Sequence, residues 1–269
     1  MELVCLLFLG LIVGFVGAFL GVGGGFIVVP ALVLLYGLDA HHAVGTSLAT
    51  VFFTGLFSAI AYFRQKRVDW KVGLLLEIFT VPGAILGAYT TTLASSEQLV
   101  ALFATFLFFV SYKMWTKKEG AVVASKVPRN NALRRTIVDS SGRRWTYEVN
   151  VLLACSLAFL AGFCSGFFGI GGGVLKVPVL IYSGIPTHIA IATSAFMISI
   201  TASSGATSHM LLGNVELGYL PWLVPGILAG TQIGARVAKK TKPRALRKAF
   251  SVALVLIAAM MIAKSLGFL

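Results

Sequence analysis

The sequence is short of charged residues, of acidic residues in particular, and of cysteine. Of 269 residues only 12% are charged and nine are Asp or Glu, whereas 58% are hydrophobic. A soluble domain of this length cannot bury so much apolar surface, so the composition excludes a soluble globular protein. The three cysteines lack C-x-x-C spacing and histidine partners, so the sequence offers neither a disulfide framework nor a metal site.

Common catalytic and nucleotide-binding signatures are missing as well. The chain contains neither H-E-x-x-H nor G-x-S-x-G, and it has no Walker-type Gly-Lys-Ser/Thr, so we expect no enzyme activity and no cofactor. The net charge of +13 comes from basic clusters between apolar runs. Such clusters are typical of cytoplasmic loops rather than of a nucleic-acid-binding surface, so we expect no nucleic-acid partner.

The sequence has instead a series of long apolar runs. Several exceed the roughly 18 residues needed to cross about 30 Å of hydrocarbon. They predict an all-α polytopic membrane protein whose sides contact the lipid bilayer. The runs are Leu3–Tyr36, Ala43–Phe63, Val72–Leu93, Leu99–Trp115, Val151–Tyr182, Ile189–Leu212, Leu217–Val237 and Leu246–Leu266.

The two halves of the chain repeat each other. GFVGAFLGVGGGFIVVP at 14–30 returns as GFCSGFFGIGGGVLKVP at 162–178. VGTSLATVF, RVDW and GAILGAY likewise match IATSAFMIS, NVEL and GTQIGAR, at an offset of 147 to 148 residues. We therefore expect membrane repeats at 1–115 and 151–269, joined by a basic loop at 116–150, in one integrated transporter domain. Within that loop, TIVDSSGRRWTYEV alternates around a turn and predicts a small β-hairpin.

Loop charges indicate the orientation of each repeat. Arg64–Lys71 and the central loop 116–150 are basic and are therefore predicted to be cytoplasmic, whereas Thr92–Gln98 between them carries no base. The pattern reverses in the second half, where Gly213–Glu216 contains no Lys or Arg and Arg236–Lys248 is basic. If each of the eight runs crossed the membrane once, Arg236–Lys248 would lie outside the cell, against the charge pattern.

The conflict disappears if each glycine-rich run enters and leaves the membrane on the same side. A single helix over Val151–Tyr182 would measure about 48 Å, too long for the bilayer, and Leu3–Tyr36 has the same excess. We place the breaks at Gly21–Gly25 and Gly169–Gly173. The prediction is two inverted repeats, each opening with a glycine-broken helical hairpin followed by three transmembrane helices, as in secondary transporters.

The glycines at the breaks have two compatible interpretations. Small residues allow helices to pack closely. A broken helix also exposes backbone amides at the N-terminus of its second half, where the helix dipole favours an anion. The candidate anion-binding glycines are Gly23, Gly24, Gly25, Gly171, Gly172 and Gly173.

Hydroxyl side chains recur at matching positions after both breaks. Thr46 and Ser47 correspond to Thr193 and Ser194 near the start of the next helix. They either cap that helix or donate hydrogen bonds to substrate oxygens. Gln232 follows a glycine in the matching GTQIGAR segment and is a further candidate for lining the binding cavity.

Three of the ionisable residues within apolar runs are candidates for a role in transport. Lys176, replaced by valine in the first repeat, would cost about 2.5–3.5 kcal/mol at the bilayer centre. It either extends to the inner surface or balances the charge of a bound anion. Glu77 either borders the inner interface or couples transport to protons. His209, near the outer turn, titrates close to neutral pH when unperturbed and is a second coupling candidate.

Taken together, the duplicated G-x-G-G-G-x-x-x-x-P, the following (G/A)-T-S and G-x-x-x-G-A before a basic C-terminal stretch resemble the sulfite exporter TauE/SafE family. The second repeat has Ala192 where the first has Gly45. The resemblance implies an inner-membrane or plasma-membrane transporter of small sulfur-containing anions. The positions that match its motifs are Gly21, Gly23, Gly24, Gly25, Pro30, Thr46, Ser47, Gly169, Gly171, Gly172, Gly173, Pro178, Thr193 and Ser194.

We therefore predict a secondary transporter, and specifically an exporter, of a small sulfur oxyanion or organosulfonate. It would work by alternating access and bind the anion at the half-helix N-termini. An anion channel with the same hairpins is the first alternative, and an intramembrane enzyme or a membrane scaffold is the second. A small anion and lipid are the expected partners, with a homodimer as a candidate assembly.

Overall fold

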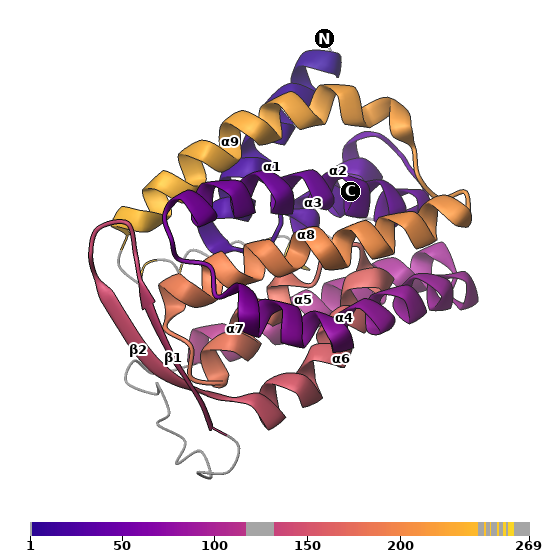
Figure 1. The fold of residues 1–269 in the computed structure, drawn as a ribbon. Helices are drawn as coiled ribbons and strands as arrows, with labels where there is room; N and C mark the ends of the chain where they lie inside the picture. Colours follow the sequence, from indigo (N-terminus) through magenta and orange to yellow (C-terminus); the bar gives the residue numbers. More distant parts are fainter. Residues whose placement is uncertain are drawn as a thin grey trace.

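The computed structural model describes residues 2–116, 132–241 and scattered positions between 245 and 260, so part of the central loop and most of the last apolar run lie outside it. The chain is mostly helical (Figure 1). The first half contains α1 (Glu2–Leu20), α2 (Gly25–Leu35), α3 (Ala40–Arg64), α4 (Trp70–Thr90), the short 3-10 helix η1 (Thr91–Leu93) and α5 (Ser96–Thr116). The second half contains β1 (Ala132–Val138), β2 (Arg144–Asn150), α6 (Val151–Phe168), α7 (Gly173–Tyr182), α8 (Thr187–Leu211), η3 (Leu217–Tyr219) and α9 (Leu220–Lys240).

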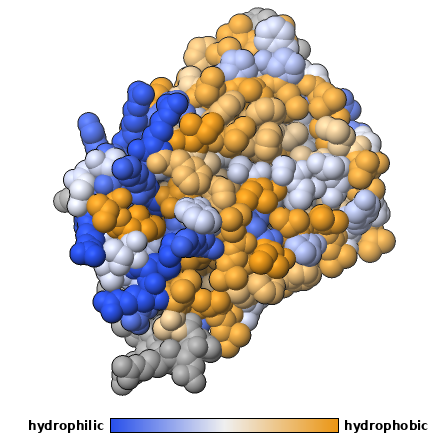
Figure 2. Space-filling view, in the orientation of Figure 1, coloured by the Kyte–Doolittle hydropathy of each residue, from blue (hydrophilic) through white to orange (hydrophobic). Residues whose placement is uncertain are grey.

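Five stretches of helix within the described residues are long and apolar enough to cross a membrane. They are Leu3–Leu20, Ala40–Arg64, Trp70–Leu93, Val151–Phe168 and Thr187–Leu211. The helices α2 and α7 are apolar but shorter. Figure 2 shows a mostly hydrophobic flank, with hydrophilic residues gathered at the end of the molecule where β1 and β2 lie. These features support a multi-pass helical membrane protein.

Both glycine segments interrupt a helix where the sequence predicts. The helix α1 ends at Leu20 and α2 begins at Gly25, whereas α6 ends at Phe168 and α7 begins at Gly173. Three glycines in each break have φ between 67° and 83°, a conformation that strains any residue with a Cβ. They are Gly21, Gly23, Gly24, Gly169, Gly171 and Gly172.

The second broken segment enters and leaves on the same side of the bundle. The backbone N–H of Asn150, just before α6, donates a 2.8 Å hydrogen bond to the carbonyl oxygen of Ser183, just after α7. The end of α2 lies at the start of α9, because the rings of Tyr36 and Tyr219 pack with centroids 5.6 Å apart. The start of α1 also lies at the start of α9, because α1 runs parallel to α9: Gly10 packs against Leu223, and Gly14 against Ile227.

Two parallel helix pairs, α1 with α9 and α4 with α6, pack backbone against backbone at glycines. A Cβ added to Gly10 would lie 2.2 Å from the carbonyl oxygen of Leu223, and one added to Gly230 would lie 2.2 Å from that of Leu11. In the other pair, a Cβ on Gly166 would lie 1.9 Å from the carbonyl oxygen of Ala84. Such contacts are the small-residue packing that brings membrane helices close together.

The predicted β-hairpin is confirmed, and it adds a two-stranded antiparallel sheet to the expected all-helical fold. Its strands pair from Ala132 with Asn150 to Val138 with Arg144. Arg135 donates two hydrogen bonds, of 2.8 and 2.9 Å, to the buried carboxylate of Asp69, which precedes α4. The hairpin is therefore held against the helical bundle by a bidentate ion pair.

A second acidic group strengthens the same attachment. The Asp139 carboxylate, in the hairpin turn, accepts 3.3 Å hydrogen bonds from Arg67 and from the indole N–H of Trp145. Tyr147 of β2 donates a 2.8 Å hydrogen bond to Asp69. Burial acts to raise the pKa of Asp69, but the hydrogen bonds from Arg135 and Tyr147 outweigh it and lower the pKa below its ordinary value.

Because the pKa of Asp69 is lowered in the folded state, its stabilising contribution is present above the ordinary carboxyl pKa. It is lost as the pH falls through the folded value. We expect Asp69→Asn to speed amide hydrogen exchange in β1 and β2 about 100-fold at neutral pH, because a hydrogen bond to a charged group contributes about 1.5–3 kcal/mol. Hydrogen-exchange mass spectrometry measures the effect.

The matched control is Glu148→Gln, which removes an exposed carboxylate from β2 and should leave exchange in both strands unchanged. Equal protection of the strands in wild type and Asp69→Asn would contradict the attachment described above.

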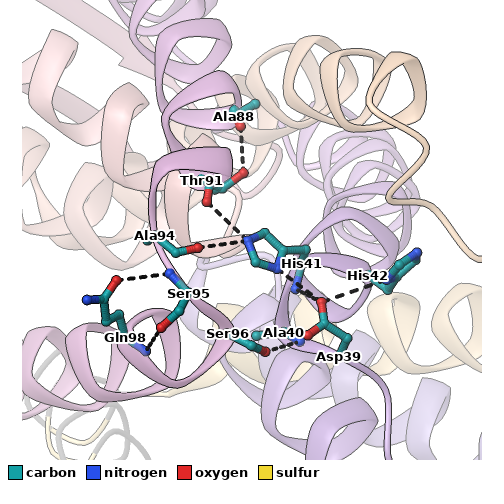
Figure 3. Close-up of polar contacts among 10 residues, drawn as sticks. All are labelled: Asp39, Ala40, His41, His42, Ala88, Thr91, Ala94, Ser95, Ser96 and Gln98. Atoms are coloured by element: carbon teal, nitrogen blue, oxygen red, sulfur yellow. Dashed lines mark hydrogen bonds and ion pairs between the residues drawn. The ribbon is translucent and has the colours of Figure 1, made fainter.

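A separate polar cluster ties the start of α3 to α5 at the opposite end of the bundle (Figure 3). One ring nitrogen of His41 lies 3.0 Å from the Asp39 carboxylate, and the other lies 3.1 Å from the carbonyl oxygens of Thr91 and Ala94. The Ser96 hydroxyl accepts the first backbone N–H of α3 at 2.9 Å. These contacts fix the helix ends and account for Asp39 and His41 structurally.

Candidate functional site

The two glycine breaks meet in the centre of the bundle. A Cβ added to Gly25 in the first break would lie 2.4 Å from the carbonyl oxygen of Gly169 in the second. Val51 of α3 and Ile198 of α8, both fully buried, lie within 3.3 Å of the Cβ positions of glycines in both breaks. The chain therefore brings its two candidate anion-binding segments into direct backbone contact, with two apolar side chains packed against both.

The four hydroxyl candidates lie inside α3 and α8, and the capping interpretation is wrong. The N-cap residue of α3 is Asp39 and that of α8 is Pro186. The hydroxyl of Ser47 donates to the carbonyl oxygen of Gly169 at 2.7 Å, and the hydroxyl of Ser194 donates to that of Gly21 at 2.8 Å. Each serine therefore holds the glycine break of the other half of the chain.

Each of the two threonines accepts a backbone hydrogen bond from the other half of the chain. The Thr46 hydroxyl accepts the backbone N–H of Glu216 at 2.9 Å, and the Thr193 hydroxyl accepts that of Asp69 at 2.9 Å. All four hydroxyl residues are fully buried, with 0% exposure. In this conformation their hydrogen bonds join one half of the chain to the other.

The second break carries the polar groups that suit an anion. The Ser165 hydroxyl of α6 is buried and has no hydrogen-bond partner among the described residues. A Cβ on Gly172 would lie 3.1 Å from the Cβ of Ser165 and 3.2 Å from the Cε of Lys176. Both side chains therefore lie beside the N-terminus of α7, whose first amides have no acceptor within the helix.

Lys176 is paired with Glu77, so it does not extend to the surface. Its ammonium donates a 2.9 Å hydrogen bond to Oε1 of Glu77, and the two side chains are only 2% and 5% exposed. The ammonium also donates to the Thr201 hydroxyl, which in turn donates to Oε2 of Glu77 at 2.6 Å. These three residues, from α7, α4 and α8, form a buried network, and the Thr80 hydroxyl lies 3.4 Å from that of Thr201.

The first break has an apolar counterpart of this network. The repeat places Gly17, Val28 and Val224 where the second break has its serine, lysine and glutamate. The counterpart of Thr201 is Thr54, and its hydroxyl donates to the carbonyl oxygen of Thr50 in its own helix, at 3.2 Å. The two breaks thus share backbone geometry and differ in chemistry.

Two predicted site residues lie outside the network. The side-chain amide of Gln232 donates to the carbonyl oxygen of Phe57 at 3.4 Å. His209 lies in the last turn of α8, where one ring nitrogen is 3.0 Å from the carbonyl oxygen of Gly166 and the other has no partner among the described residues. The structure therefore brings Glu77 to Lys176 but leaves His209 apart.

The sequence analysis missed two residues of this region, Ser165 and Thr201. A signal for Ser165 was present, because it is the polar replacement for Gly17 in otherwise similar segments. Thr201 gave no such signal, since a threonine occurs at the equivalent position of both repeats. Its role depends on which side chains surround it in the folded chain.

Amides, a hydroxyl and an ammonium around one helix N-terminus are donors that suit an oxyanion. The neighbouring carboxylate makes the resting network neutral. Among residues 2–116, 132–241 and the described positions beyond, no three His, Cys, Asp or Glu side chains could hold a metal ion.

The chain is also similar in sequence to known proteins. The family model of the sulfite exporter TauE/SafE matches residues 6–261. The chain is 35% identical over 270 residues to "Probable membrane transporter protein YunE" of Bacillus subtilis, covering 97% of this chain and 98% of that protein. It is 28% identical to "Probable membrane transporter protein MJ0441" of Methanocaldococcus jannaschii, covering 90% and 88%.

A plant relative matches over a shorter stretch. "Sulfite exporter TauE/SafE family protein 6" of Arabidopsis thaliana is 34% identical over 123 residues, covering 45% of this chain and 28% of that protein. No solved structure matches the chain. From the near-complete family match and the helices long enough to span a bilayer, we conclude that the chain is a membrane transporter and belongs to the sulfite exporter TauE/SafE family.

Proposed function

We propose that the protein is a secondary transporter that exports a small sulfur oxyanion or organosulfonate by alternating access. The observation that carries the proposal is the second break, where Ser165 and Lys176 lie beside the N-terminus of α7. The family name, and the word sulfite in the name of the plant relative, support a sulfur oxyanion. The Ser165 hydroxyl and the α7 amides contact the anion's oxygens, and Lys176 balances its charge.

The architecture proposed for this mechanism is the pair of inverted repeats at 1–115 and 151–269. Two contacts support it. The start of α6 lies beside the end of α7, and the start of α1 and the end of α2 both lie at the start of α9. The reciprocal exchange between the halves through Ser47 and Ser194 also supports this architecture. Alternating access then moves one repeat against the other around the paired breaks.

We propose that the chain resides in the cell (inner) membrane with loop 116–150 in the cytoplasm, because that loop is basic. In a variant whose three native cysteines are replaced by alanine, a cysteine at Asn214 should react with a membrane-impermeant maleimide added to intact cells. A cysteine at Thr241 should react only after permeabilisation. The opposite labelling pattern would reverse the proposed orientation.

Anion binding is tested by thermal unfolding of the purified protein with sulfite, sulfate, thiosulfate, isethionate and acetate. We expect at least one sulfur oxyanion to raise the unfolding temperature, and acetate to have a smaller effect. Ser165→Ala should weaken the effective anion about tenfold, because it removes one hydrogen bond to a charged group. Ser58→Ala is the matched control, since Ser58 is also a buried hydroxyl without a partner among the described residues but lies outside the site.

Transport itself is tested by counterflow in proteoliposomes. An alternating-access transporter accelerates uptake of labelled anion when unlabelled anion is trapped inside, and the acceleration saturates. Unitary currents without counterflow would support the channel alternative. Absence of both flux and anion-induced stabilisation would overturn the proposed function.

A further inference from the structure

The buried network at Lys176 has no net charge, because the Lys176 ammonium is balanced by the Glu77 carboxylate. Glu77 and Lys176 form a 2.9 Å ion pair, and both side chains are almost completely buried. An anion that takes the place of Glu77 beside Lys176 leaves two negative groups near one positive group. Without compensation, a net negative charge would remain in an apolar part of the membrane, which is strongly unfavourable.

We infer that Glu77 is a proton-binding site that takes up one proton whenever an anion binds at Lys176, so that anion and proton move together. The inference rests on the proposed function, because it assumes that the anion binds at the second break. The proton comes from water on the loading side and bonds to a carboxylate oxygen of Glu77. The Lys176 ammonium keeps its three hydrogens, and the hydrogen that it donates to Glu77 is donated to the anion instead.

Thr201 can hold Glu77 in both protonation states. In the resting network its hydroxyl donates to the Glu77 carboxylate at 2.6 Å and accepts from Lys176. Once Glu77 is protonated and Lys176 turns to the anion, the same hydroxyl oxygen accepts the carboxyl hydrogen. The hydrogen of the Thr201 hydroxyl can then turn to the Thr80 hydroxyl, which lies 3.4 Å away, so the exchange leaves no buried group unpaired.

Among the described residues of α4 and of the two long helices packed against it, α6 and α8, no other ionisable side chain is placed to take this role. The helix α6, packed against α4, contains no Asp, Glu, Lys, Arg or His, and its two titratable residues are cysteines. On α8, His188 and His209 lie in the first and last turns, about 12 Å or more along the helix from Thr201. Lys71 is in the first turn of α4. Glu77 is therefore the carboxylate that faces the lysine.

The experiment follows protons and anions together in proteoliposomes that contain the pH indicator pyranine. The probes are 35S-labelled sulfate, thiosulfate and isethionate, anions of strong acids that have no permeant neutral form near neutral pH. We expect a transported anion to acidify the lumen by one proton per anion. Lowering the external pH should speed uptake. For monovalent isethionate, a potassium potential set with valinomycin should have no effect on the rate.

Glu77→Gln keeps the shape of the side chain but cannot take up the proton. This variant should still move anion, without lumen acidification, and its flux should now respond to the membrane potential. Glu77→Asp should restore acidification at a lower rate. Thr201→Val should weaken coupling, whereas Thr54→Val, at the equivalent position of the first repeat, should not.

Two results would overturn the inference: wild-type anion uptake with no lumen acidification, or unchanged acidification in Glu77→Gln. The wild-type measurement decides the matter even if Glu77→Gln does not fold. If none of the three probes enters and no anion stabilises the protein in the thermal assay, the proposed function itself fails, and the coupling fails with it. Uptake without acidification overturns the coupling alone.

Discussion

Replacing Lys176 by methionine is expected to lower anion flux in proteoliposomes about 100-fold, because it removes the ammonium beside the α7 N-terminus. A charged hydrogen bond of about 2.7 kcal/mol corresponds to that factor. The same change leaves Glu77 buried without its partner, and breaking one side of a buried ion pair costs about 3–5 kcal/mol of stability. Flux is measured with labelled anion, and stability by thermal unfolding.

The double variant Lys176→Met/Glu77→Met separates these two effects. It removes the unpaired carboxylate, so most of the lost stability should return, while anion flux should stay low. Wild-type-like flux in the single or the double variant would remove Lys176 from the transport mechanism. Recovery of both stability and flux in the double variant would assign the pair a purely structural role.

Gly166→Ala is expected to disrupt the packing of α4 against α6. The new Cβ would lie 1.9 Å from the carbonyl oxygen of Ala84 and 2.8 Å from the backbone N of Ala88, so the helix backbones must separate. Overpacking of this kind costs about 1–3 kcal/mol and sometimes more. Because the clash is with backbone atoms, we expect a cost in the upper part of this range, above the helix-propensity gain of about 1 kcal/mol from replacing glycine. We expect a lower unfolding temperature and a smaller yield of monodisperse protein.

The matched control for this prediction is Gly218→Ala in η3. An added Cβ there has no atom within 4 Å, and the φ angle of Gly218 is not positive. Its unfolding temperature should equal that of the wild type. A wild-type-like Gly166→Ala protein would mean that α4 and α6 do not pack at the described distance.

Much of this fold could be predicted because its strongest determinants are local or repeated. Helix breaks follow from glycines that adopt positive φ, and the β-hairpin follows from alternation around a turn. The contact between Ser47 and Gly169 could not be predicted, because it joins residues 122 positions apart. Their matching positions in the repeats show equivalence and give no information about which partner each hydroxyl finds.

The site was predicted less completely than the fold. Lys176 and Glu77 could both be predicted as candidates, because a charged side chain is costly in an apolar run. That the two form a pair depends on how α4, α7 and α8 pack, which neither residue's sequence neighbours specify. The sequence marks Ser165 as the polar replacement for Gly17, but the burial of its hydroxyl without a partner among the described residues depends on the three-dimensional surroundings.

The reciprocal serine bonds also bear on how the protein is made. While a ribosome has delivered only the first half, the carbonyl oxygen of Gly21 has no Ser194 to bind, and the hydroxyl of Ser47 has no Gly169. Each half therefore lacks a hydrogen-bond partner that only the other half supplies. The nascent chain therefore reaches its mature form only after α8 has been inserted, because the bond between Ser194 and Gly21 cannot form earlier.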